Sequence, residues 1–336
     1  MDMDWSKLGF GYSDVNCHIK YVWRDGKWDK GELVKEPYLN IHIAATALHY
    51  GQTAFEGMKV FRGQDDKLRV FRPQMNAARI NRSAARCRMA QIPEEMFVDA
   101  IRRVVRANAE FVPPYGMGAT MYVRPLLIGT GPQMGVNPAN EYTFIIMVMP
   151  VGAYYKGGLS PVKAIILDDF DRAAPQGTGD VKVGGNYGSS LLPHHIAHEA
   201  GYPIELYLDA AEHKYIDEFG TSNFIAITKD GKYVTPQSKA ALPSVTNDGL
   251  RQVAEKLGMP VEIRPVLFSE LKDFAETAAC GTAVVMTPVN EYHRGDLVIK
   301  VGPREGCGPQ LQKLYDHYTD IQWGRVKDTL GWLVEI

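Results

Sequence analysis

The sequence is poor in cysteine, and its four cysteines lie far apart: Cys17, Cys87, Cys280 and Cys307. None stands in a C-x-x-C pair, which argues against a zinc site and against a disulfide scaffold and fits a reducing compartment. The first residues, Met-Asp-Met-Asp-Trp-Ser-Lys, lack the basic and apolar regions of a secretory signal. These absences predict a cytoplasmic protein.

Long apolar runs are also absent, and neither sign of charge dominates. The longest apolar run, Phe144 to Val151, is far shorter than the ~20 residues of a membrane helix and predicts a buried strand. The net charge of −2 gives no global attraction to nucleic acid or to an anionic membrane. Seven arginines between Arg62 and Arg88 form the one local bias. We interpret most of them as a solvated face and one of them as a candidate anion ligand.

What is present is an ordinary globular composition, with 45% hydrophobic residues in a chain of 336, enough for one large domain or two ordinary ones. Helix and strand signals are mixed without regular βαβ alternation, which predicts an α+β fold. A change to Gly, Tyr, Lys, Ser and Pro near 152–161 marks a domain linker. We therefore expect an N-terminal domain at 1–155, a connection at 156–179 and a C-terminal domain at 180–336. Apolar spacing predicts helices at 73–89, 94–111, 187–199 and 245–257.

The densest group of glycines surrounds Lys182. Five glycines lie within twelve residues, in Gly177-Thr-Gly-Asp-Val-Lys-Val-Gly-Gly-Asn-Tyr-Gly188. Such density marks special dihedral angles or a close approach of the chain to a ligand. A desolvated lysine loses its proton readily and becomes a nucleophile. Lys182 is therefore a candidate for covalent chemistry, and the alternative is a solvated lysine in a surface loop.

Three further segments join small polar residues to turn signals: Glu218-Phe-Gly-Thr-Ser-Asn223, Leu242-Pro-Ser-Val-Thr-Asn247 and Ala279-Cys-Gly-Thr-Ala283. Turn chemistry or a plain helix N-cap explains each of them alone. Together, a lysine, a lone carboxylate and N–H-rich turns suit pyridoxal phosphate. That cofactor needs an amine for its aldehyde, an acid at its pyridine nitrogen and donors for its phosphate.

Other site patterns are weak or missing. The sequence contains neither G-x-G-x-x-G nor G-x-x-x-x-G-K-[ST], and H-E-x-x-H is absent. His194 and His198 have the i, i+4 spacing of a metal pair. Because no glutamate stands between them in the metalloprotease pattern, we interpret them as histidines on a helix surface. No metal is expected.

With these segments in view, the chain resembles the branched-chain amino acid aminotransferases of fold type IV. The resemblance implies a two-domain fold, with a smaller N-terminal and a larger C-terminal domain, and pyridoxal 5'-phosphate as cofactor. The matching segments recur in order from about Leu48 to Val289: Leu48-His-Tyr-Gly-Gln-Thr-Ala-Phe-Glu-Gly-Met-Lys59, Phe71-Arg-Pro-Gln-Met-Asn-Ala-Ala-Arg79, Tyr122-Val-Arg-Pro125, Pro150-Val-Gly-Ala-Tyr154, Lys182-Val-Gly-Gly-Asn-Tyr187, Glu218-Phe-Gly-Thr-Ser-Asn223 and Gly281-Thr-Ala283.

The resemblance implies a role for each cofactor contact. Lys182 would form the Schiff base, and Glu218 would pair with the pyridine nitrogen. Tyr187 would hydrogen-bond the phenolic oxygen, and Arg79 would be the phosphate arginine. Further phosphate donors, largely backbone N–H groups, would come from Val245, Thr246 and Thr282.

On the substrate side, the resemblance implies an aromatic pocket for leucine, isoleucine or valine. Arg124 would hold the side-chain carboxylate of glutamate, and the turn at Thr282 and Ala283 would hold the α-carboxylate. Val136 and Tyr50 would be contributed across a dimer interface, so a homodimer or a higher homo-oligomer is implied. The pocket walls would be Tyr50, Phe55, Tyr122 and Tyr154, whose alternative role is plain core packing.

Two positions depart from the family pattern. Where its eukaryotic members carry a C-x-x-C redox pair, this chain has Val284-Val-Met-Thr287, so no thiol switch is expected there. Ser244 replaces a more usual glycine in the Leu-Pro-Gly turn. Because serine disfavours a positive φ, its backbone conformation will show whether that turn needs one.

The implied activity is transamination between a branched-chain L-amino acid and 2-oxoglutarate, which gives glutamate and a branched 2-oxo acid. D-amino acid aminotransferase and aminodeoxychorismate lyase activities are the alternatives on the same fold. A non-catalytic pyridoxal-phosphate binding protein and a cofactor-free binding module are the alternatives outside catalysis.

Overall fold

The computed structural model describes residues 3–152 and 159–336, and these fall into two compact units. Unit 1 comprises Met1–Tyr154, Val181–Gly184 and Ile321–Ile336, and unit 2 comprises Tyr155–Asp180 and Gly185–Asp320. The division differs from the expected 1–155 and 180–336 at two places. The segment that carries Lys182 and the C-terminal residues both belong to unit 1, so the two units are similar in size.

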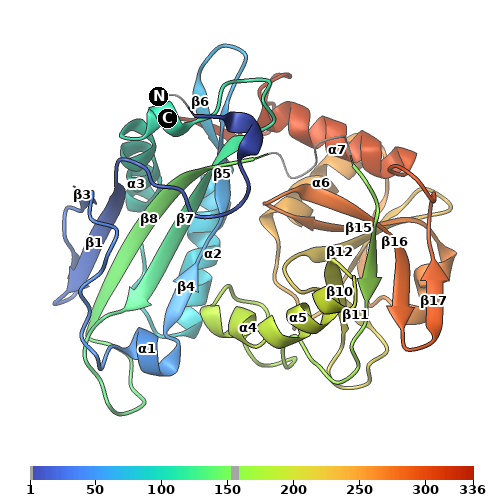
Figure 1. Ribbon diagram of the computed structural model, residues 1–336, viewed down its shortest axis with the longest axis horizontal. Coiled ribbons are helices and arrows are strands. Elements are labelled where there is room, and N and C mark those ends of the chain that lie inside the picture. The colour runs from blue at the N-terminus through green and yellow to red at the C-terminus, as the bar shows by residue number, and fades with distance from the viewer. Residues whose placement is uncertain (1–2, 153–158) are drawn as a thin grey trace. The chain divides into compact units, whose positions relative to one another are not determined.

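The described strands of unit 1 form one sheet in the order β18-β6-β5-β7-β8-β1-β2, with β3 beside β1 and β4 beside β7 (Figure 1). The C-terminal residues join it because β18 pairs with β6 and the Arg72 N–H donates to the Trp332 carbonyl over 2.7 Å. The strands are β1 (His18–Arg24), β2 (Lys27–Trp28), β3 (Glu32–Val34), β4 (Thr53–Phe55), β5 (Met58–Arg62), β6 (Leu68–Phe71), β7 (Thr120–Gly129), β8 (Glu141–Val151) and β18 (Leu333–Glu335).

Helices α2 (Pro73–Arg86) and α3 (Glu94–Arg106) lie against one face of this sheet (Figure 1). In α3, Phe97, Ile101 and Val104 recur at helical spacing and enter the same core cluster as alternate residues of the strands. Because side chains alternate along β7, Met121 and Val123 enter this core. Tyr122 and Arg124 therefore point from the opposite face. A short helix, α1 (Thr46–Tyr50), and two 3-10 turns, Trp5–Lys7 and Ala109–Phe111, complete unit 1.

Unit 2 is built on a second sheet, with strand order β11-β10-β9-β16-β15-β12-β13-β14 and with β17 beside β16. Parallel and antiparallel pairs are mixed in it, which confirms the α+β expectation. The strands are β9 (Val162–Ile165), β10 (Ile204–Leu208), β11 (Ile216–Phe219), β12 (Asn223–Thr228), β13 (Tyr233–Pro236), β14 (Val261–Arg264), β15 (Phe274–Gly281), β16 (Val285–Arg294) and β17 (Leu297–Lys300). The helical segments are α4 (Gly184–Gly188), α5 (Leu191–Glu199), α6 (Val245–Lys256), the 3-10 turn Phe268–Asp273 and α7 (Pro309–Gln322).

The predicted helices exist, but their ends differ where side chains compete with the backbone. The helix expected at 187–199 is divided, because the Ser190 hydroxyl donates to the Tyr187 carbonyl over 2.9 Å between α4 and α5. The helix expected at 94–111 ends at Arg106, followed by Asn108, whose side chain donates to the Val104 carbonyl over 2.7 Å. Within the described residues, no helix has the length and apolar character needed to cross a membrane.

Candidate active site

Lys182 lies on a short extended segment that is fixed against unit 1 on both sides. The Phe55 N–H donates to the Lys182 carbonyl over 3.1 Å, and Val183 forms an antiparallel bridge with Ala54. On the other side, the Lys182 N–H donates to the Ser83 hydroxyl of α2 over 2.9 Å. The lysine backbone is therefore held by β4 and by α2, so the point from which its side chain extends is fixed.

The Lys182 amine has an environment that favours its neutral form. Nζ lies 4.7 Å from the centre of the Phe55 ring. Burial, aided by the Arg79 charge, lowers the pKa of Lys182 to about 8, and the Glu56 charge opposes this shift. A buried ammonium with a cation nearby gives up its proton more easily than one in water. Lys182 therefore meets the physical condition for a nucleophilic amine, and its covalent role stays a prediction.

Arg79, the predicted phosphate arginine, is buried in an ion pair that sequence reasoning missed. Its Nε and Nη2 each lie 2.7 Å from one oxygen of Glu56, a side chain with no exposed surface. Asn76 donates to the same carboxylate over 2.7 Å. The paired geometry fixes the guanidinium plane. The signal was present in the sequence, since Glu56 belongs to the Phe-Glu-Gly part of a matching segment.

The sheet face opposite the helices of unit 1 gathers Phe55, Tyr122 and Arg124. The Arg124 Cζ lies 5.0 Å from the Phe55 ring centre and 5.2 Å from that of Tyr122, and Nη2 donates to the Tyr122 hydroxyl over 3.1 Å. Among the described residues, the buried Arg124 Nε has no hydrogen-bond partner. Gly57 is required here, because a Cβ at this position would lie 2.1 Å from the Tyr122 oxygen. The result is an apolar wall that carries one cation.

The other predicted pocket residues that the structure describes, Tyr50 and Val136, are not part of this group. Tyr50 ends α1, and its hydroxyl donates to the carbonyl of Met134, in the loop that contains Val136. Val136 is 85% exposed and Tyr50 is 41% exposed, so neither side chain is buried within this chain. Tyr154 lies outside the described residues.

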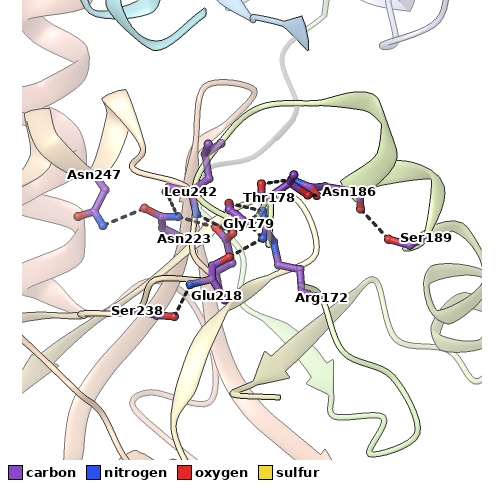
Figure 2. A network of polar contacts seen from close by, with 11 residues as sticks. Arg172, Thr178, Gly179, Asn186, Ser189, Glu218, Asn223, Ser238, Leu242 and Asn247 are labelled. Atoms are coloured by element: carbon purple, nitrogen blue, oxygen red, sulfur yellow. Dashed lines mark hydrogen bonds and ion pairs between the residues drawn. The ribbon is translucent and has the colours of Figure 1, made fainter. Parts of the chain in front are cut away.

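In unit 2, Glu218 is held by donors on both of its oxygens (Figure 2). The Leu242 N–H donates to Oε1 over 2.9 Å, and Asn223 Nδ2 donates to Oε2 over 2.7 Å. Arg172 Nη2 lies 2.6 Å from Oε1, and both side chains of this ion pair are buried. The carboxylate is therefore fixed in position and compensated in charge.

The same network leads from Glu218 to the first turn of α6. Asn247 Nδ2 donates to the Asn223 oxygen over 3.1 Å (Figure 2). The Ser244 hydroxyl accepts from the Asn247 N–H over 3.2 Å as the helix N-cap. Ser244 has a φ of −81°, so this turn does not need glycine. Val245 and Thr246, the predicted phosphate donors, are the first two helical residues and are buried.

The other predicted contacts lie on short segments of unit 2. Tyr187 belongs to α4 and is half-buried, and Thr282 and Ala283 form the turn between β15 and β16. Gly179 explains part of the glycine density before Lys182, because a Cβ there would lie 2.1 Å from the Ala240 carbonyl oxygen. That contact is with backbone, so a larger residue would displace the loop.

These donors fit the cofactor expected from the sequence. Unit 1 by itself contains an amine of lowered pKa and a fixed arginine, and unit 2 by itself contains a buried carboxylate linked to a helix N-terminus. An amine, an acid and phosphate-binding N–H groups are the contacts that pyridoxal phosphate requires. A metal is not supported in the same way. His194 pairs with Glu205 over 3.1 Å, and the described residues contain no group of three or more His, Cys, Asp or Glu arranged for an ion.

Comparison with known proteins gives the class to which this site belongs. Residues 53–292 match the model of the amino-transferase class IV family, which covers well over half of the chain. The chain therefore belongs to the class IV aminotransferases. It is an enzyme whose reaction class is amino-group transfer.

Particular relatives narrow the comparison further. The chain is 47% identical to the branched-chain-amino-acid aminotransferase of Haemophilus influenzae, over 100% of this chain and 99% of that one. It is 43% identical to the enzyme of the same name from Helicobacter pylori, over 100% and 98%. Among solved structures, the branched-chain amino acid aminotransferase of Escherichia coli superposes with a TM-score of 0.78 at 30% identity, covering 93% of this chain and 98% of that chain. The T.th. enzyme of the same name, complexed with N-(5'-phosphopyridoxyl)-L-glutamate, has a TM-score of 0.78 at 26% identity, covering 98% of each.

Proposed function

We propose that this enzyme is a branched-chain amino acid transaminase. It transfers the amino group of L-leucine, L-isoleucine or L-valine reversibly to 2-oxoglutarate, with pyridoxal 5'-phosphate held at Lys182. The observation that carries the proposal is Arg124 lying against the rings of Phe55 and Tyr122 on one sheet face. An apolar wall with a single cation suits an enzyme whose two substrates carry a branched aliphatic chain and a carboxylate in turn.

Each charged residue of the site has a separate task. When bound, pyridoxal phosphate supplies an electron sink for charge that develops at the substrate Cα. Glu218 would hold a proton at the pyridine nitrogen. Arg79 in unit 1, and the N–H groups of Val245 and Thr246 in unit 2, are the phosphate ligands that the family resemblance implies. Tyr187 donates to the phenolic oxygen, and Thr282 with Ala283 binds the α-carboxylate of the substrate.

Lys182 does the covalent and proton-transfer work. Its amine would be the group that holds the cofactor's aldehyde, and it would become free to act on the substrate once the substrate amine is bound. The free amine, with a pKa of about 8, would remove the proton from the substrate Cα as a general base and deliver it, as a general acid, to C4′ of the cofactor. A base that titrates near the working pH is effective in both directions, as a reversible exchange requires.

The direct test mixes the purified protein with L-leucine and 2-oxoglutarate and assays for glutamate. Formation of glutamate from L-leucine but not D-leucine supports the proposal, and reaction with D-leucine alone favours D-amino acid aminotransferase activity. A yellow protein that exchanges no amino groups would be a non-catalytic cofactor-binding protein. A colourless protein that gains no absorbance with added pyridoxal phosphate would be a cofactor-free binding module.

Arg124→Gln should separate the two half-reactions. Loss of a charge-assisted hydrogen bond, worth about 1.5–3 kcal/mol, lowers the single-turnover efficiency with 2-oxoglutarate by roughly 10- to 100-fold. The leucine half-reaction should change by less than about threefold, because an aliphatic side chain gains nothing from the cation. Arg24→Gln, which removes an exposed arginine of the same unit, is the control. Equal losses in both half-reactions would remove Arg124 from this role.

We further propose that the enzyme is a cytoplasmic homodimer. Apolar side chains are exposed on α1 and on the loop beside it: Leu48 is 60%, Met134 75% and Val136 85% exposed. These segments are joined by the contact of Tyr50 with Met134 and by an Ala45–Pro132 bridge. An apolar patch of this kind is typical of a subunit interface. The four cysteines are free thiols, as a reducing compartment allows.

Val136→Asp should therefore weaken the dimer. A charge placed in an apolar interface must be desolvated, so the apparent dissociation constant should rise at least ~10-fold in sedimentation velocity. An exposed valine outside the patch, Val326, gives the matched control Val326→Asp, which should leave the dimer intact. A wild-type protein that sediments as a monomer at every concentration would contradict the proposal.

A further inference from the structure

Arg172 is a buried arginine to which the sequence assigned no role. Its Nη1 donates to the Ala240 carbonyl over 2.7 Å, and its Nη2 lies 2.6 Å from Glu218 Oε1 (Figure 2). Nη1 also lies 3.4 Å from the Gly179 carbonyl, at the end of the segment that precedes Lys182. The guanidinium therefore links the segments that carry Gly179, Glu218 and Ala240, and it contacts the Glu218 carboxylate directly.

Other titratable groups lie near this ion pair, but Glu218 is the carboxylate that Arg172 contacts directly. Tyr207 on β10 is 3% exposed, and burial raises the pKa of its hydroxyl, so it stays neutral. Cys280 on β15 is also neutral, because burial raises the pKa of its thiol. Asp217 on β11 feels the Arg172 charge, but burial raises its pKa, and Ser238 hydrogen-bonds its side chain.

The physical consequence concerns the charge of Glu218. Only 2% of the Glu218 residue surface is exposed, and burial disfavours the charged form of a carboxylate. Two neutral donors, the Leu242 N–H and the Asn223 amide, offset part of this cost. A full positive charge 2.6 Å from one oxygen offsets far more. The same contact, with the Ala240 carbonyl behind it, fixes the direction of the carboxylate plane.

We propose that Arg172 is a positioning residue that keeps Glu218 ionised and oriented as the acid partner of the cofactor's pyridine nitrogen. The proposal rests on the proposed function. Arg172 does not contact the cofactor in this role; it acts through Glu218. Without it, Glu218 retains the proton that it should share with the pyridine ring, and the ring loses its capacity to accept electrons.

The test places nitrogen-15 in the pyridine ring of the cofactor and records its chemical shift in the bound protein. In wild type, Arg172→Lys and Arg294→Met the shift should be that of a protonated pyridine. Arg294 pairs with Asp168 and does not contact Glu218, so it is the matched control. In Arg172→Met the shift should move towards the unprotonated value, and the leucine half-reaction should slow at least ~10-fold. A protonated shift in Arg172→Met overturns the proposal.

A second measurement uses the apo-protein and separates this proposal from the proposed function. Arg172→Met should lower the urea midpoint of unfolding, and adding Glu218→Gln should recover part of the loss, because no unpaired buried charge remains. Strict additivity of the two variants would overturn the pairing even if the enzyme is a transaminase.

Asp217→Asn tests the neighbouring carboxylate. A pyridine shift like that of Arg172→Met would mean that Arg172 acts through Asp217 and would refute the assignment to Glu218. Absence of any cofactor in wild type would refute the proposed function and leave the apo-protein result to decide the pairing.

Discussion

Lys182→Ala should abolish transamination, with a loss of at least ~10,000-fold in turnover with leucine and 2-oxoglutarate. The substitution removes both the nucleophile and the proton carrier, and no other described lysine is anchored at the same place by Phe55 and Ser83. Lys163→Ala, which removes an exposed lysine paired with Glu291, should keep at least half of the activity. Steady turnover of Lys182→Ala would contradict the assignment of the covalent lysine.

The pH dependence of Lys182 gives an independent check on the apo-protein. Burial, aided by the Arg79 charge, lowers its pKa to about 8, whereas an unperturbed lysine titrates near ~10.4. Below pH 8 the amine is mainly protonated and unreactive; above it the neutral form predominates. Labelling with an amine-specific reagent, followed by peptide mapping, should therefore rise through pH 8 at Lys182, while surface lysines follow near pH 10. Equal labelling of Lys182 and Lys163 across the range would show that the amine is not desolvated.

Glu218→Gln should have the second largest effect, a fall of roughly 100- to 1,000-fold in the rate of the leucine half-reaction. Glutamine keeps the shape of the side chain but carries no charge with which to hold a proton at the pyridine nitrogen. Binding of leucine should change little, because the substrate pocket is formed by other residues. The decisive measurement is stopped-flow absorbance of the cofactor band at saturating leucine.

The same variant should also be less stable, because it leaves the Arg172 charge buried without its carboxylate. Such breaks cost about 3–5 kcal/mol of unfolding free energy. Glu205→Gln is the matched control, since Glu205 is another buried carboxylate of unit 2 and pairs with His194. It should lose stability but retain a leucine half-reaction within about threefold of wild type. A rate loss of equal size in both variants would mean that Glu218 acts only through stability.

Local signals predicted some elements well and others poorly, for identifiable reasons. The helix expected at 245–257 is observed at Val245–Lys256, because its Ser244 cap and its apolar stripe lie within the segment itself. The helix expected at 73–89 ends at Arg86, where Arg88 adopts a φ of 55° that no residue-type signal marks. Local signals also did not predict the domain boundary, because residues 321–336 join unit 1 through a strand pairing with β6, which is distant in sequence.

The candidate site, like the fold, was predicted only in part from the sequence. Lys182 and Glu218 stand in segments with their own turn chemistry, whereas Arg79, which lies within a helix, was named by the family resemblance alone. Their partners Ser83, Glu56 and Arg172 are distant in sequence or outside the motifs, so pairing them required the fold. Spacing predicts neighbours along one helix or strand, but it does not predict which buried charge meets which across elements.

The amino-acid sequence by itself thus determined the kind of chemistry: an amine, an acid and phosphate-binding turns are properties of residue type and local order. The tertiary structure decided the state of these groups. Burial beside Phe55 and Arg79 makes Lys182 a weak base, and Arg172 places a positive charge against Glu218. The physical reason is that a pKa and a side-chain orientation depend on desolvation and on nearby charges in space, and only the folded chain brings those together.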